Sequence, residues 1–175
     1  MSRFLDAANL LLGCFQTALQ APHIAPIVPE HVMLRAGAEV TPLLGTNDDE
    51  CCRGMAWVRI ASITGVRQIN STAAGDSLCF RGERTLLLEM GAVRCAPTSP
   101  KESVPTEDQW NQAATLADAD QSAMEQAICC AFNDLDGPDT WWISDVAVQE
   151  YQPTGVDGNC IGGTMTVELT FNRCC

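Results

Sequence analysis

The order of the hydrophobic segments constrains the fold of this chain more than any other sequence feature. Apolar residues recur at steps of three and four over residues 2–20, which predicts an amphipathic helix. Residues 55–63 and 85–94 are rich in bulky and β-branched side chains, which favour strands. The proline-rich segment 21–50 is expected to form mostly loop, with one short strand at 32–40.

A second amphipathic helix is predicted after the prolines of residues 97–105. Thr106 stands three residues before Gln109, the spacing of a capping box that satisfies free amides where a helix begins. An apolar stripe starts at Trp110 and continues along this segment, so we expect Trp110 to lie in the core. The sequence Asp-Gly-Pro at residues 136–138 is the predicted stop signal.

Two further strands are predicted toward the end of the sequence, at 141–151 and 164–171. The glycine-rich segment 155–163 is expected to join them as a long loop and so to complete an antiparallel hairpin. Strands and helices do not alternate regularly, so this order does not demand a parallel sheet. We therefore predict one α+β domain over residues 1–175, with a mostly antiparallel sheet and two helices packed on one of its faces.

The charge of the chain argues against several classes of function. Its 22 acidic and 10 basic residues give a net charge of -12. Surfaces that grip DNA or anionic lipid concentrate lysine and arginine, so neither is an expected ligand. No run of about 18 apolar residues and no signal peptide is recognised. We expect a soluble protein that is made in a cytoplasm and has no membrane partner.

Cysteine is the residue type whose use stands out, with ten in 175 residues. Three adjacent pairs occur, but none has the Cys-x-x-Cys spacing that zinc ribbons and redox motifs use. Disulfides, buried reduced thiols and a zinc site assembled from distant segments all stay open; one possible bridge joins Cys95 to the end of the second helix. The candidate structural cysteines are Cys51, Cys52, Cys95, Cys129, Cys130, Cys160, Cys174 and Cys175.

The residues that usually carry catalysis are sparse. His23 and His31 both lie in the proline-rich segment, and no serine or cysteine lies in a nucleophile elbow. The acidic run 48–50 lacks the alternating ligands of a calcium loop, and no phosphate-binding glycine motif occurs. We expect no enzymatic activity, no cofactor and no metal site.

Trp141 and Trp142 are adjacent at the start of a predicted strand, where successive side chains point to opposite faces. One of them is expected to enter the core and the other to face outward, under a loop or against a partner. The pair is therefore the candidate interface.

Four stretches of the sequence form a distinctive series. They are Cys51–Ile60 (CCRGMAWVRI), Leu88–Pro97 (LEMGAVRCAP), the helix end at Cys129 and Cys130, and Gly158–Thr164 (GNCIGGT). In this order they resemble the cysteine-rich head-to-tail joining proteins, or tail terminators, of long-tailed phages that infect actinobacteria. The resemblance covers roughly residues 48–175 together with a helical N-terminus.

This resemblance implies a structural virion protein of the head-tail junction, assembled in the host cytoplasm and without catalytic residues. It implies a ring, expected to be a homohexamer, that caps the tail tube and joins the tail to the head. The implied partners are the tail tube protein and the head-completion or connector proteins, and genome DNA passes through the lumen without specific binding. Six copies would carry 6 × -12 = -72 charges, which would repel the phosphates of the genome.

Two alternatives stay open at this point. The first is the neighbouring head-completion or stopper protein of the same phage neck, which also forms a ring. The second belongs to a different class, a cysteine-based metal-binding or redox protein, which stoichiometric zinc in the purified chain would favour.

Overall fold

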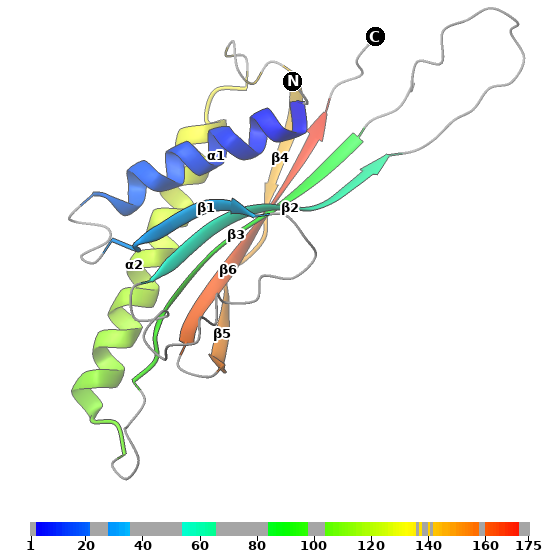
Figure 1. Ribbon diagram of the computed structural model, residues 1–175. Helices are drawn as coiled ribbons and strands as arrows, with labels where there is room; N and C mark the ends of the chain where they lie inside the picture. The colour runs from blue at the N-terminus through cyan, green and yellow to red at the C-terminus, as the bar shows by residue number, and fades with distance from the viewer. Residues whose placement is uncertain are drawn as a thin grey trace, which may run out of the picture.

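In the part of the chain that it describes, the computed structural model has two helices and a six-stranded sheet (Figure 1). The residues that it describes are 3–21, 28–35, 54–65, 84–97, 104–135, 137, 140, 142–157 and 160–171. The elements are α1 (Arg3–Leu19), β1 (His31–Arg35), β2 (Met55–Gly65), β3 (Arg84–Cys95), α2 (Glu107–Phe132), β4 (Ile143–Val148), β5 (Gln152–Asp157) and β6 (Cys160–Phe171). The predicted α+β class is confirmed.

The sheet has the order β1-β2-β3-β6-β4, and β5 also pairs with β6. All of these pairings are antiparallel except the one between the short edge strand β1 and β2. The last strand in the chain order, β6, therefore lies inside the sheet. It pairs with β3 along its whole length, while β4 and β5 occupy the two halves of its other side.

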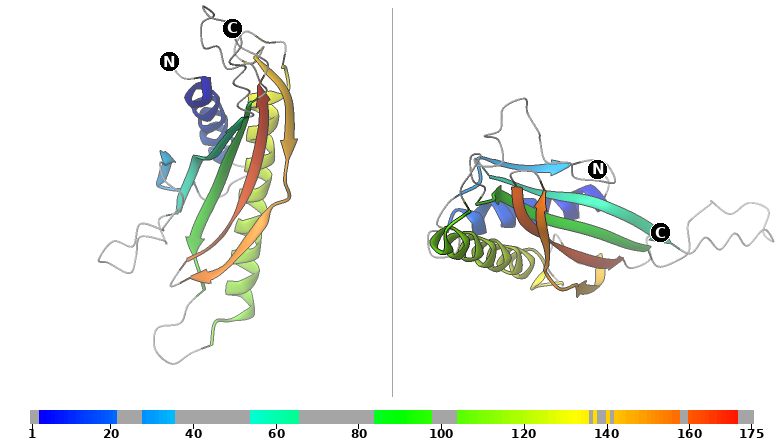
Figure 2. Two further views of the ribbon diagram at one scale, coloured as in Figure 1. Left: turned by 90° about the vertical axis from the view of Figure 1, so that its right-hand side faces the viewer. Right: turned by 90° about the horizontal axis from the view of Figure 1, so that it is seen from below.

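Both helices pack on one face of the sheet, as predicted (Figure 2). α1 lies against β1, β2 and α2, and α2 also contacts β3 and β6. The core between these layers is formed by alternate residues of the long strands and by the apolar stripes of both helices, because successive strand residues point to opposite faces. Leu11, Phe15 and Leu19 of α1 are fully buried there, together with Leu88, Val167 and Leu169.

The start of α2 has the predicted cap, but its first turns are not in the core. Thr106 accepts a hydrogen bond from the backbone N–H of Gln109, and the Gln109 side chain accepts one from the backbone N–H of Thr106. The prediction for Trp110 is wrong, because its side chain is 43% exposed. The N-terminal turns of α2 extend past the end of the sheet, so this part of the stripe has no strand beneath it (Figure 1).

The predicted long loop of the last hairpin is also wrong. β5 runs to Asp157 and β6 begins at Cys160, and these two residues pair. Gly162 and Gly163 of this segment lie in β6, where close neighbours leave no room for side chains. A Cβ atom at Gly163 would overlap the phenol ring of Tyr151, and one at Gly162 would overlap the backbone of β3.

Candidate functional site

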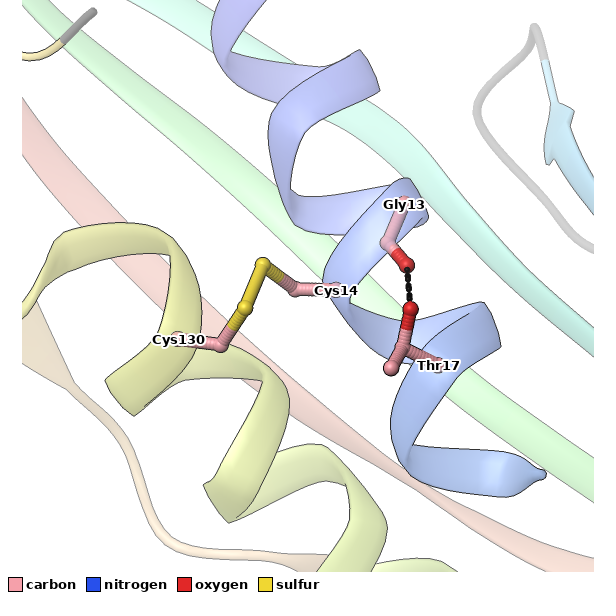
Figure 3. The surroundings of a disulfide bond; sticks show 4 residues. All are labelled: Gly13, Cys14, Thr17 and Cys130. Carbon is pink, nitrogen blue, oxygen red and sulfur yellow. Dashed lines mark hydrogen bonds between the residues drawn. A yellow bond between two sulfur atoms is a disulfide. The ribbon is translucent and has the colours of Figure 1, made fainter. Parts of the chain in front are cut away.

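A disulfide joins the two helices of the helical layer. Cys14 lies on the buried side of α1 and Cys130 in the last turn of α2, and their Cα atoms are 5.8 Å apart. Figure 3 shows the two side chains pointing toward each other across the crossing of the helices. The bond links positions that are 116 residues apart in the sequence. It therefore ties the first helix of the fold to the long central one.

The remaining cysteines fall into three groups. Cys95 and Cys160 are also disulfide-bonded, whereas Cys129 is a free, exposed thiol. The predicted bridge from Cys95 to the end of α2 is wrong, because the two cysteines there are accounted for: Cys130 bonds to Cys14 and Cys129 is free. The candidate cysteines Cys51, Cys52, Cys174 and Cys175 lie outside the described residues.

Cys14 is the bonded cysteine that the sequence analysis missed. Its position in the apolar stripe of α1, three residues after Leu11 and next to Phe15, was the available signal. A cysteine on the buried side of one helix can bond to a cysteine on a second helix that packs against it. The choice between Cys129 and Cys130 depends on the rotation of α2, which the sequence pattern at the end of the helix does not define.

A buried ion pair links α2 to the sheet. The guanidinium of Arg94 on β3 donates from Nε to Asp120 Oδ2 at 2.9 Å and from Nη2 to Asp120 Oδ1 at 2.5 Å. Arg94 is 5% exposed and Asp120 is 1% exposed. The two hydrogen bonds offset the desolvation cost of burying the two charges. They also fix the middle of α2 above the end of β3.

Tyr151 lies beside this ion pair, where β4 gives way to β5. Its hydroxyl is buried and has no hydrogen-bond partner in the described structure. Burial raises the pKa of Tyr151 to about 12, and the negative charge of Asp120 adds to the shift. The side chain therefore stays neutral at physiological pH, and it packs over Gly163 of β6 as part of the core.

The sheet face opposite the helices carries a second, smaller apolar cluster. Met55, Trp57, Val93 and Cys160 form it, and Met33 of β1 packs against it. Beside this cluster, Arg59 and Glu89 face each other across β2 and β3 and form an ion pair with two hydrogen bonds of 2.7 Å and 2.6 Å. The four residues of the cluster are between 3% and 8% exposed, so this part of the face is buried within the chain itself.

Of the two tryptophans of the candidate interface, Trp142 lies within the described residues. Trp142 is buried and stacks on Phe171 of β6, with 5.0 Å between the ring centroids. It is the tryptophan that enters the core, and its burial means that it does not supply an exposed interface. Trp141 lies outside the described residues.

The described surface exposes far more acid than base. Each of the five described arginines, Arg3, Arg35, Arg59, Arg84 and Arg94, has an interaction partner. In contrast, Glu107, Asp108 and Asp118 are exposed along the first half of α2. Acidic side chains without matching bases create a negative potential, which is unfavourable for nucleic-acid phosphates and favourable for a basic partner.

The β4–β5 side of the sheet is an exposed edge. In the described part of the chain, both strands pair with β6 alone. Val148 is 51% exposed and Val156 is 48% exposed along this edge. Unpaired backbone groups and exposed valines on an edge strand are typical of a surface that can contact another chain.

No protein-family model matches the sequence, and neither does any curated protein. Within the described residues, no three histidine, cysteine, aspartate or glutamate side chains gather as metal ligands would. Neither described helix combines the length and the apolar character that a membrane crossing requires.

Proposed function

We propose that this protein is a structural subunit of a phage neck, a tail terminator that forms a homohexameric ring, caps the tail tube and joins the tail to the head. The proposal begins from the resemblance of the four sequence stretches between Cys51 and Thr164. The observation that carries it further is the one-sided arrangement of the fold. Both helices cover one face of the sheet, and the β4–β5 edge at its side is left for a neighbouring chain.

A closed ring requires two different surfaces on each subunit, because every copy contacts the next in a head-to-tail manner. The β4–β5 edge, with its exposed Val148 and Val156, supplies one such surface. The edge strand β1 and the projecting start of α2 lie elsewhere on the subunit and supply candidates for the second (Figure 1). A subunit with this shape can contact two neighbours at once.

The acidic surface fits a conduit for DNA. A ring of six copies carries about -72 charges, and an acidic lumen wall forms no lasting contacts with the phosphates that pass it. The exposed carboxylates in the first half of α2 are the described residues that we assign to the lumen or its rim. Neutralising substitutions there should slow the passage of DNA without preventing ring formation.

Mass and symmetry test this proposal. Six copies of the 18.8 kDa chain give about 113 kDa, and electron microscopy should show sixfold rings at the ends of tail tubes. Val148→Glu places a charge on the β4–β5 edge and should yield smaller species. Asn9→Glu, which adds the same charge on the exposed side of α1, should leave the ring intact. A protein that stays monomeric and is absent from tail tube ends would overturn the proposal.

The same particles separate the terminator from the stopper role. Antibody labelling of tails that have not joined a head should mark their head-proximal ends if the protein is a terminator. Labelling that is confined to heads would instead assign the protein to the head-completion or stopper position.

A further inference from the structure

We propose that the Cys14–Cys130 disulfide is a redox-controlled clamp that fixes α1 on the helical layer, and that it can open and close without unfolding of the domain. The inference starts from the position of the bond. It joins α1 to α2 covalently, and Cys14 lies more than one turn inside either end of α1.

The two bonded cysteine residues differ in their exposure to solvent. Cys130 is in an exposed position in the last turn of α2, whereas Cys14 is almost fully covered. A small thiol can therefore reach the bond from the Cys130 side while the core remains packed. Disulfides that solvent can reach are the ones that exchange most readily with small thiols.

The interactions that remain after reduction hold α1 less firmly. Leu11 and Phe15 stay buried against the sheet, and Phe4 contacts the ring of Phe171 with 4.9 Å between centroids. Gln16 also donates one hydrogen bond of 3.4 Å to the carbonyl of Val32. These contacts keep α1 folded onto the core, but they permit local opening that the covalent bond prevents.

Closure of the clamp is a balanced exchange with a low-molecular-weight disulfide. The Cys130 thiolate attacks one sulfur of that molecule, breaks its S–S bond and releases one small thiolate. The Cys14 thiolate then attacks the Cys130 sulfur of the mixed disulfide and releases the second small thiolate. The small disulfide takes up two electrons, and the two protons of Cys14 and Cys130 pass to the released thiolates.

The timing of closure rests on the proposed function. A subunit that is made in a reducing cytoplasm would hold α1 by packing alone during assembly, and it would close the clamp after release into an oxidising medium. The clamp itself does not depend on that function. If rings fail to form and α1 still responds to reduction, the neck role fails and the clamp stands.

Hydrogen exchange measured by mass spectrometry tests the clamp. The double variant Cys14→Ala/Cys130→Ser should exchange the α1 amides at least about tenfold faster than the native protein, and its Tm should be lower by about 10 °C. Cys129→Ser removes the neighbouring thiol and keeps the bond, so it should behave as the native protein does. Unchanged α1 exchange in the double variant would overturn the proposal.

A second measurement covers the case in which the double variant does not fold. The native protein is treated with dithiothreitol and alkylated, and the labelled cysteines are identified by mass spectrometry while circular dichroism follows the fold. We expect Cys14 and Cys130 to be labelled while the helical signal persists. Labelling of these two cysteines only as fast as the whole domain unfolds would overturn the proposal.

Discussion

The indole of Trp57 lies over Gly91, its partner across β2 and β3, and fills the space that a side chain at position 91 would need. Gly91→Ala therefore has to displace a buried ring that also donates to Glu89 Oε1 at 3.4 Å. We expect a loss of about 1–3 kcal/mol in the free energy of unfolding, measured by urea denaturation. Gly155→Ala is the matched control, because an added Cβ there meets no atom of the described chain within 4 Å. Equal losses in the two variants would contradict this account.

Replacing only one partner of the Arg94–Asp120 ion pair should lower the free energy of unfolding. Arg94→Met leaves the Asp120 carboxylate buried without its partner, so we expect a loss of about 3–5 kcal/mol in stability. The double variant Arg94→Met/Asp120→Leu should recover most of this loss, because no charge is then left in the core.

The Arg59–Glu89 ion pair, on the sheet face opposite the helices, supplies the comparison for the loss of stability. The side chains of Arg59 and Glu89 are 12% and 19% exposed, so Arg59→Met should cost less than Arg94→Met. Thermal unfolding of the three variants in one buffer measures the order, and an Arg59→Met variant that is the least stable would contradict it.

The element order was predictable because it depends on local pattern. The stripe of α1, the Thr106 cap and the bulky residues of β2 and β3 each report on a few neighbouring residues. Trp110 was misplaced because its stripe continues past the end of the sheet, and the position of that end depends on how the strands align. The hairpin loop was misread because the same glycines suit a turn and a crowded strand equally well.

The candidate site depends on contacts between distant segments, so little of it was predictable. Cys14 and Cys130 meet only because the two helices cross at those positions. Nothing in the sequence distinguishes Arg94 and Asp120 from other basic and acidic residues, because their contact depends on how β3 and α2 pack together. Trp142 is buried rather than exposed because it stacks on Phe171, a residue of β6 that is distant in the sequence.

Tyr151 supplies a prediction about both stability and pH. Its buried hydroxyl has no partner in the described structure, so Tyr151→Phe should leave stability unchanged or slightly raised. A clear loss would indicate a bond to this hydroxyl and would contradict the assignment.

The raised pKa of Tyr151, about 12, also sets a pH dependence. The unfolded chain loses this proton near pH 10, whereas the folded protein keeps it until about pH 12. The contribution of the Tyr151 hydroxyl to the free energy of unfolding is therefore complete below pH 10 and is lost as the pH rises from 10 to 12. Urea midpoints across this window should fall more steeply for the native protein than for Tyr151→Phe. Parallel pH profiles would contradict the shift.

The capping box of α2 can be tested on the same helix. Thr106→Ala removes the acceptor for the Gln109 N–H, and we expect a loss of about 1 kcal/mol. Thr115→Ala is the control, because the Thr115 hydroxyl only donates to the carbonyl of Asn111 one turn earlier. Alanine there should be neutral or slightly stabilising. Calorimetric unfolding should rank the two variants in this order, and the reverse order would exclude a role for the cap.

The position of β6 inside the sheet has a consequence for synthesis on the ribosome. The partner residues of β3 are synthesised 65 to 87 residues later, since Cys95 pairs with Cys160 (160 − 95 = 65) and Arg84 with Phe171 (171 − 84 = 87). During that interval the apolar side of β2 and β3 has no completed sheet to join. We therefore expect the nascent chain to need a chaperone or rapid elongation, and the domain to close only after residue 171 has left the exit tunnel.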